Sequence, residues 1–165
     1  MSPFGCVPSV VGDPYVAIPF LRAFTPAILA YGMINIEIVG DLNLNLNLKD
    51  EHSSTRVCLW ARYPDGNHFI AAGFSLRPMA GCCGVLISHQ SFVAHAWQGK
   101  GIGHLMQDMK DWIGKTLKIG KLIATVVEGN GAEEHILRKH GWAAGIPFIN
   151  HRTGHTVVEW EKVFK

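Results

Sequence analysis

The chain has 165 residues, of which 48% are hydrophobic and only 17% are charged. This length corresponds to one ordinary domain, and the composition is too apolar for a disordered chain, so we expect a single compact domain over residues 1–165. The formal net charge of +2 is much lower than that of a dedicated nucleic-acid-binding protein, which is strongly basic.

Residues 1–15 are rich in Pro, Gly and Ser and predict an irregular N-terminal arm. They lack the basic start and the apolar run of a signal peptide. The most hydrophobic stretch, residues 16–34, is interrupted by Pro19, Arg22 and Pro26 before it could span a bilayer. We therefore expect no membrane segment.

In the next segments the spacing of apolar residues is first that of a helix and then that of strands. Apolar residues recur at helical spacing from residue 20 to residue 31, and the period then changes to two. A hairpin with one apolar face is predicted over residues 34–48. Its apolar face could be covered within one chain, or the hairpin could form a sheet between two copies of the chain. A second hairpin follows around the turn residues 64–67.

The C-terminal half predicts the remaining elements in the order strand, helix, strand, helix and strand pair. Their expected ranges are 85–94, 101–117, 122–127 and 131–140, followed by 142–150 with 155–164. The fold class that follows is α/β, with one central mixed, mostly antiparallel sheet and helices on both faces.

A glycine-rich hexapeptide, Gln98-Gly99-Lys100-Gly101-Ile102-Gly103, lies between a predicted strand and an amphipathic helix. Glycines allow a tight turn, and the free N–H groups and positive dipole end of a helix N-terminus bind phosphate oxygens. Neither a Walker loop nor a Rossmann fingerprint is present. The alternative is an ordinary glycine-rich start of a helix.

The segment around this loop resembles the acetyl-CoA-binding motif of the GNAT superfamily of N-acetyltransferases. Gln98, Gly101 and Gly103 match its Gln/Arg-x-x-Gly-x-Gly/Ala pattern, and Val93 matches the apolar residue upstream. A second family element matches further on, with Asn130 ending a strand before a helix that closes in Gly141-Trp142. The resemblance covers residues 85–142, while the N-terminal 55 residues match only loosely.

The resemblance implies that residues 85–142 form a cofactor-binding core for acetyl-CoA. The backbone of Phe92 and Val93 would pair with the pantetheine arm, and Asn130 would lie near it. The acetyl group would occupy a gap between two central strands. The pyrophosphate would be held by the loop amides of Gln98, Gly99, Lys100, Gly101, Ile102 and Gly103.

Acetyl transfer to a lysine-like amine needs a base, because deprotonating a group of pKa ~10.4 at pH 7 costs ~4.6 kcal/mol. The family often has a Glu four residues before the apolar strand residue, and this chain has His89 there. The pKa of a free histidine suits that role, and strand alternation would put His89, Ser91 and Val93 on one face. The alternative is a structural histidine, with Glu128 and His95 as weaker candidates for the base.

The family commonly supplies a Tyr, seven residues after the Asn, to protonate the departing thiolate. This chain has Leu137 at that position, so the proton must come from water or from another group such as His135 or His140. Without that acid, the same resemblance would also fit a non-catalytic acyl-CoA-binding or interaction module.

The nine histidines raise the further alternative of a metal-dependent enzyme. His151 and His155 flank the last turn and could join His52 or His68, but no Cys or carboxylate at ligand spacing accompanies them. We therefore expect no metal. The four cysteines, Cys6, Cys58, Cys82 and Cys83, contain no Cys-x-x-Cys pair and predict reduced thiols in a cytoplasmic protein.

The function that the sequence predicts is an N-acetyltransferase that moves an acetyl group from acetyl-CoA, its co-substrate, to a primary amine. The amine would attack directly in a ternary complex, as the resemblance implies. The net charge argues only weakly against a polynucleotide acceptor, and the sequence does not identify the amine.

Overall fold

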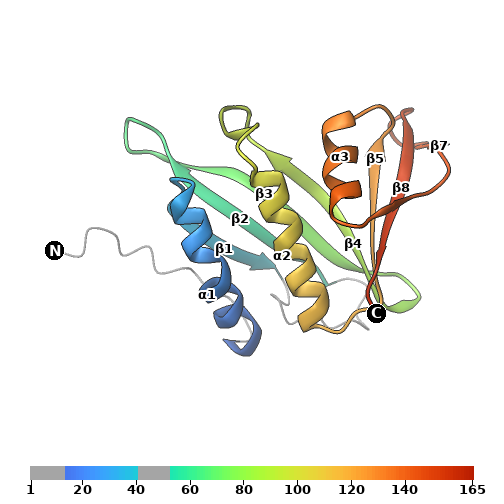
Figure 1. Ribbon diagram of the computed structural model, residues 1–165, viewed down its shortest axis with the longest axis horizontal. Coiled ribbons are helices and arrows are strands. Elements are labelled where there is room, and N and C mark those ends of the chain that lie inside the picture. The colour runs from blue at the N-terminus through green and yellow to red at the C-terminus, as the bar shows by residue number, and fades with distance from the viewer. Residues whose placement is uncertain (1–13, 41–52) are drawn as a thin grey trace.

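The computed structural model describes residues 14–40 and 53–165, which form three α-helices, one short 3-10 helix and eight strands (Figure 1). In chain order the elements are α1 (Pro14–Ala30), β1 (Asn35–Gly40), β2 (Thr55–Arg62), β3 (His68–Met79), β4 (Cys82–Val93), η1 (His95–Trp97), α2 (Ile102–Thr116), β5 (Lys121–Val127), α3 (Gly131–Lys139), β6 (Ala143–Ala144), β7 (Phe148–Ile149) and β8 (Thr156–Val163).

The strands form one sheet in the order β1-β2-β3-β4-β5-β8-β6, with β7 also paired to β8. Strand β4 runs parallel to β5, and the other pairs are antiparallel. The predicted α/β fold with a mixed, mostly antiparallel sheet is therefore confirmed.

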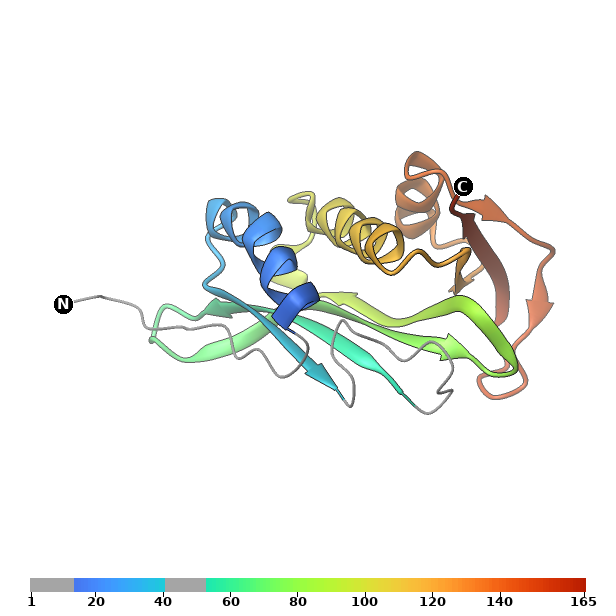
Figure 2. The same cartoon turned by 90° about the horizontal axis from the view of Figure 1, so that it is seen from below.

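The helices cover the sheet from one side. Figure 2 shows α1, α2 and α3 in a row over the same face. Contacts agree with this view, because Arg138 of α3 lies over the Trp160 ring of β8 and Asp111 of α2 accepts a 2.6 Å hydrogen bond from Lys162 of β8. In the described residues this differs from the expectation of helices on both faces.

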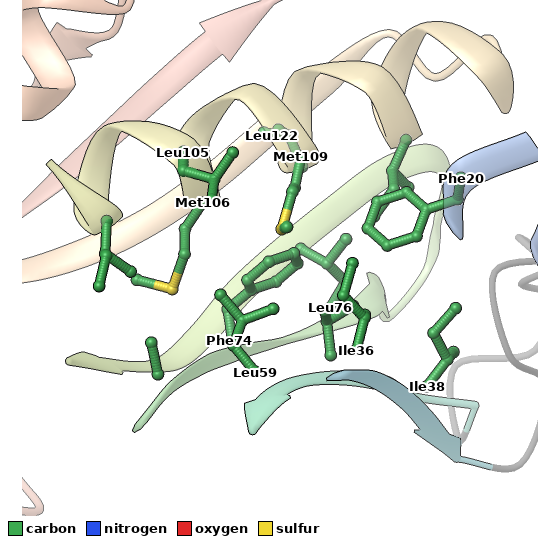
Figure 3. Close-up of a cluster of buried hydrophobic side chains, with 14 of the residues drawn as sticks. Phe20, Ile36, Ile38, Leu59, Phe74, Leu76, Leu105, Met106, Met109 and Leu122 are labelled. Carbon is green, nitrogen blue, oxygen red and sulfur yellow. The ribbon is translucent and has the colours of Figure 1, made fainter. Parts of the chain in front are cut away.

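The core lies between α2 and the first strands of the sheet. Figure 3 shows Met106 and Met109 pointing from α2 toward Phe74 and Leu76 of β3, with Phe20 of α1 closing one end. All five side chains are at most 5% exposed. Burying a side chain of this size contributes about 1.5–3 kcal/mol, so this apolar stripe fixes α2 on the sheet.

Strands β4 and β5 stay together only at their beginnings. Their parallel pairing covers Val85–Ile87 and Lys121–Ile123 and then stops. On the other edge of β4, the register with β3 shifts between the His89 and Phe92 pairs, and Gln90 has a φ of 54°. This bulge bends β4 away from β5, because an extra residue on one strand increases its local twist.

The bulge corrects one expectation from the sequence. Simple alternation placed His89, Ser91 and Val93 on one face, but the left-handed residue Gln90 interrupts the period between His89 and Ser91.

Most predicted elements are found within a few residues of their expected ends. Helix α1 begins at Pro14, earlier than expected, because proline fits the first turn of a helix. The predicted C-terminal pair is reduced to the two-residue strands β6 and β7, since Gly145 and Pro147 interrupt the segment opposite β8.

Some expectations concern segments outside the described residues. Residues 1–13 of the predicted N-terminal arm lie outside the described residues, and so does the whole second strand of the 34–48 hairpin. A dimer through that hairpin therefore stays a prediction. No helix in residues 14–40 or 53–165 is both long and apolar enough to cross a membrane.

Candidate cofactor and acyl-transfer site

Two cavities lie where β4 and β5 diverge. The larger, of about 870 Å³, extends from the end of β4 over the glycine-rich loop to α2 and α3. The smaller, of about 240 Å³, lies between β4 and β5 and is also lined by residues of α2 and α3 and by Trp142. Five residues line both cavities and mark their junction: Ser91, Gln107, Lys110, Asn130 and Glu133.

The glycine-rich loop forms one end of the larger cavity. Gly99 and Gly101 have φ values of 75° and 88°, which place both in the left-handed region where L-residues with side chains are strained. Gly101 is also the N-cap of α2, and no side chain caps that helix. The first amides of a 15-residue helix therefore face the cavity with the positive end of its dipole, as an anion site requires.

Side chains around the loop hold it in place. Gln98 donates a 3.0 Å hydrogen bond from Nε2 to the carbonyl of Val93, which ties the loop to the end of β4. Gly103 packs so closely on α3 that an added Cβ would lie 2.8 Å from Cδ1 of Ile136. Lys100 lies outside the cavity lining, with its ammonium 4.7 Å from the Trp97 ring centroid.

The other predicted cofactor residues line the larger cavity: Phe92, Val93, Gln98, Gly99, Gly101, Ile102, Gly103 and Asn130. Beyond Ile87, the edge of β4 that faces β5 has no strand partner among the described residues. An extended ligand could pair with that edge as an added strand. Asn130 also accepts a hydrogen bond from the amide of Glu133 and so caps α3.

His89 lines the smaller cavity and is partly buried. Its Nε2 is buried and has no hydrogen-bond partner among the described residues. Burial, and then the nearby charge of Arg77, lower the pKa of His89 below 6.5, so the imidazole is neutral at pH 7. A neutral imidazole can accept a proton at its unprotonated ring nitrogen, so His89 is a candidate base.

The other candidates for the general base or acid do not line the smaller cavity. His95 and Glu128 are exposed and line neither cavity. His135 lines the larger cavity only. His140 lies outside both, with its Nε2 3.0 Å from Nδ1 of His104 and its Nδ1 3.7 Å from Asp108.

Leu137, which stands at the family's tyrosine position, is 1% exposed and lines the smaller cavity. It brings an apolar surface to the place where the resemblance predicts an acid. No group of three or more His, Cys, Asp or Glu side chains within the described residues is placed to hold a metal ion.

Sequence reasoning missed Lys110, which is 2% exposed. Its Nζ donates a 2.9 Å hydrogen bond to Oγ of Ser91 and lies 5.1 Å from the Phe74 ring centroid. Burial lowers the pKa of Lys110 to about 8, against the opposing effects of Glu133 and Asp111. The sequence pattern could have identified this lysine as buried. Lys110 lies four residues after Met106 and three before Ile113, on the apolar face of the helix.

Comparisons with known proteins support the architecture. No protein-family model matches the chain, and no curated protein matches it. Solved structures do match. One assigned as a phosphinothricin N-acetyltransferase aligns with 21% identity and a TM-score of 0.56 over 67% of this chain and 72% of that chain.

Two further solved structures align with this chain to a similar extent. Spermidine N-acetyltransferase from Vibrio cholerae, solved with CoA and spermine, aligns with 19% identity and a TM-score of 0.51 over 67% of this chain and 65% of that chain. A protein from Desulfovibrio desulfuricans assigned to the GNAT family aligns with 13% identity and a TM-score of 0.54 over 67% and 69%. At these identities the likeness establishes that the chain has the GNAT acetyltransferase fold.

Proposed function

We propose that this protein is an acetyl-CoA-dependent N-acetyltransferase that acts on a primary amine by direct attack in a ternary complex. The observation that carries the proposal is that the two cavities adjoin and share five lining residues. One has a helix N-terminus and an unpaired strand edge suited to a long phosphorylated ligand, and the other has a neutral histidine. The two meet at five residues, where a thioester and an amine could come into contact.

In the proposed complex, the amides of the loop and of the first turn of α2 hold the pyrophosphate, and the β4 edge near Phe92 and Val93 pairs with the pantetheine arm. The acetyl group then lies at the junction beside Asn130. His89 takes the proton of the attacking amine, directly or through a water in the smaller cavity. We place this single-domain enzyme in the cytoplasm and propose no metal in its reaction.

The first test is ligand binding, measured by thermal shift with acetyl-CoA, CoA and ATP. A ligand at ~100 times its Kd stabilises the fold by ~2.7 kcal/mol, which corresponds to a rise in Tm of roughly 5–11 °C for a chain of this length. We expect both CoA species to raise Tm and ATP to leave it unchanged. The absence of a shift with either CoA species would refute the proposal.

A matched pair of variants localises the binding. Gly101→Glu puts a side chain and a negative charge into the loop, at a φ of 88° and with a Cβ 3.1 Å from the Tyr31 hydroxyl, so CoA binding should be lost. Gly154→Glu introduces the same charge at a φ of 75° in a turn that lines neither cavity, and it should bind CoA normally. Equal CoA affinity in the two variants would place the site elsewhere.

Transfer is then tested with an amine panel that includes spermidine, phosphinothricin and peptides with a free α-amine, with CoA release as the readout. Acetylation of one class identifies the acceptor. The second candidate function, a non-catalytic acyl-CoA-binding module, is favoured by the buried Leu137 at the acid position. CoA binding without transfer to any member of the panel would support that candidate.

A further inference from the structure

The residues that the two cavities share include two ionisable side chains that the proposed reaction has not yet used. Of the five residues that line both cavities, Lys110 and Glu133 have ionisable side chains. Lys110 is almost fully buried, and its hydrogen bond to Ser91 is its only one among the described residues. A buried ammonium with unused donors at the meeting point of two cavities suggests a role in chemistry.

The proposed reaction requires a proton at this place. When the amine attacks the thioester, the C–S bond breaks and a thiolate forms. The neighbouring Leu137 has no proton to give, and each histidine that lines a cavity lines only one of them: His89 the smaller, and His104 and His135 the larger. Lys110 lies eight residues along α2 from Ile102, or about 12 Å from the expected phosphate site. Lys110 there lines both cavities, at the junction where the proposed function brings the sulfur and the acceptor together.

We infer that Lys110, acting through the hydroxyl of Ser91, delivers the proton that the leaving CoA sulfur takes up. This inference rests on the proposed function. Ser91 Oγ touches the sulfur and gives it a proton, while Lys110 Nζ passes a proton to Ser91 Oγ through the existing 2.9 Å hydrogen bond. The N–C bond forms, the C–S bond breaks, CoA leaves as a thiol, and the neutral Lys110 regains its proton from water.

The surrounding charges suit this exchange. The pKa of Lys110, about 8, is close to that of a free thiol, near ~8.5, so the proton can pass in either direction at little cost. Glu133 on α3 and Asp111 on α2 favour the ammonium, and His89 on β4 is neutral at pH 7. Lys110 is therefore charged at pH 7 and loses its proton as the pH rises through about 8.

The first experiment needs CoA alone. The thiol of bound CoA is titrated by the ultraviolet absorbance of its thiolate in the wild type, Lys110→Met, Ser91→Ala and the control Lys115→Met, an exposed lysine on the same helix. An ammonium near the sulfur should lower the thiol pKa by about one unit or more. We expect this lowering in the wild type and Lys115→Met, and its loss in Lys110→Met.

The outcomes separate the two proposals. CoA that binds to the wild type with the same thiol pKa as in Lys110→Met would overturn the inference and leave the proposed function intact. CoA that does not bind to the wild type would overturn both. Ser91 is exposed, so Ser91→Ala should fold normally, and an unchanged kcat in this variant would overturn the relay through its hydroxyl.

Turnover provides a second readout once an acceptor is known. Lys110→Met and Ser91→Ala should each lower kcat on the order of 100-fold at pH 7 with an unchanged Kd for acetyl-CoA. The wild type should lose activity above about pH 8, where Lys110 is neutral, and this alkaline decline should be absent in Lys110→Met. A changed acceptor KM with unchanged kcat would instead show that Lys110 only binds the acceptor, which would overturn the inference.

Discussion

Replacing Lys110 by methionine should make the protein more stable at neutral pH. The side chain is 2% exposed, and burial lowers its pKa from an ordinary 10.5 to about 8. The folded protein therefore holds the ammonium less favourably than the unfolded chain does. Methionine is of similar length and keeps the apolar contacts of the stem without the charge.

The magnitude follows from the shift in pKa. A lowering of about 2.5 units corresponds to about 3 kcal/mol, from ~1.36 kcal/mol per unit, and this cost is fully present below the folded pKa. As the pH rises from 8 toward 10.5, the folded state loses its proton first and the cost disappears. The advantage of Lys110→Met should thus fall from about 3 kcal/mol at pH 7 to about 1 kcal/mol at pH 10. The loss of the Phe74 contact with the ammonium reduces the value at pH 7.

Urea unfolding of the wild type and Lys110→Met at pH 7, 8.5 and 10 measures this change directly. Near pH 7 the difference corresponds to a rise in Tm of roughly 6–12 °C for a domain of this size. Lys115→Met, which removes an exposed lysine from the same helix, should show no pH-dependent difference from the wild type. A stability difference between Lys110→Met and the wild type that is constant from pH 7 to 10 would refute the reasoning.

Two further predictions address the base and the helix contact. His89→Ala should lower kcat on the order of 100-fold, leave the Kd for acetyl-CoA unchanged and remove the acidic limb of the kcat profile, which lies below pH 6.5 because the pKa of His89 is lowered. His95→Ala, an exposed control, should behave as the wild type, and an unchanged profile in His89→Ala would remove it as the base. Gly103→Ala should destabilise the fold by about 1 kcal/mol, since crowding against Ile136 outweighs the gain in helix propensity. Ile136→Val, which lacks Cδ1, should restore the Tm of Gly103→Ala, and a failure to do so would show that the contact is not the cause.

Local patterns in the sequence were sufficient to predict most of the fold. The apolar stripe of α2 has the helical period, and Gly101 marks its start because the loop needs a left-handed residue there. The proposed cofactor residues other than Asn130 are predictable for the same reason, since they form one continuous loop and the end of the strand before it. All of them except Lys100 line the larger cavity.

The features that the sequence did not reveal depend on tertiary contacts. The bulge at Gln90 contains no glycine, which is the usual sequence signal for a left-handed residue. A 3.3 Å hydrogen bond from the Ser75 hydroxyl of β3 to the Gln90 amide oxygen stabilises it. Lys110 lies on the apolar face of α2, and the sequence does not show that its ammonium contacts Ser91 of β4. That hydrogen bond is seen only in the folded structure. The charge of Lys110 and the shape of β4 are therefore linked by a contact between residues 19 positions apart in the chain.

The separation of β4 from β5 accounts for several properties of the site together. It leaves one edge of β4 beyond Ile87 without a strand partner in the described part of the chain. It also opens the smaller cavity beside His89 and places Ser91 within reach of Lys110. A continuous sheet would cover the strand edge and fill the cavity. The stability and the proton delivery of Lys110→Met are therefore best interpreted together. Higher stability with lost proton delivery would show that Lys110 serves the reaction at a cost to the stability of the fold. Higher stability with unchanged chemistry would show only that the buried charge is unfavourable.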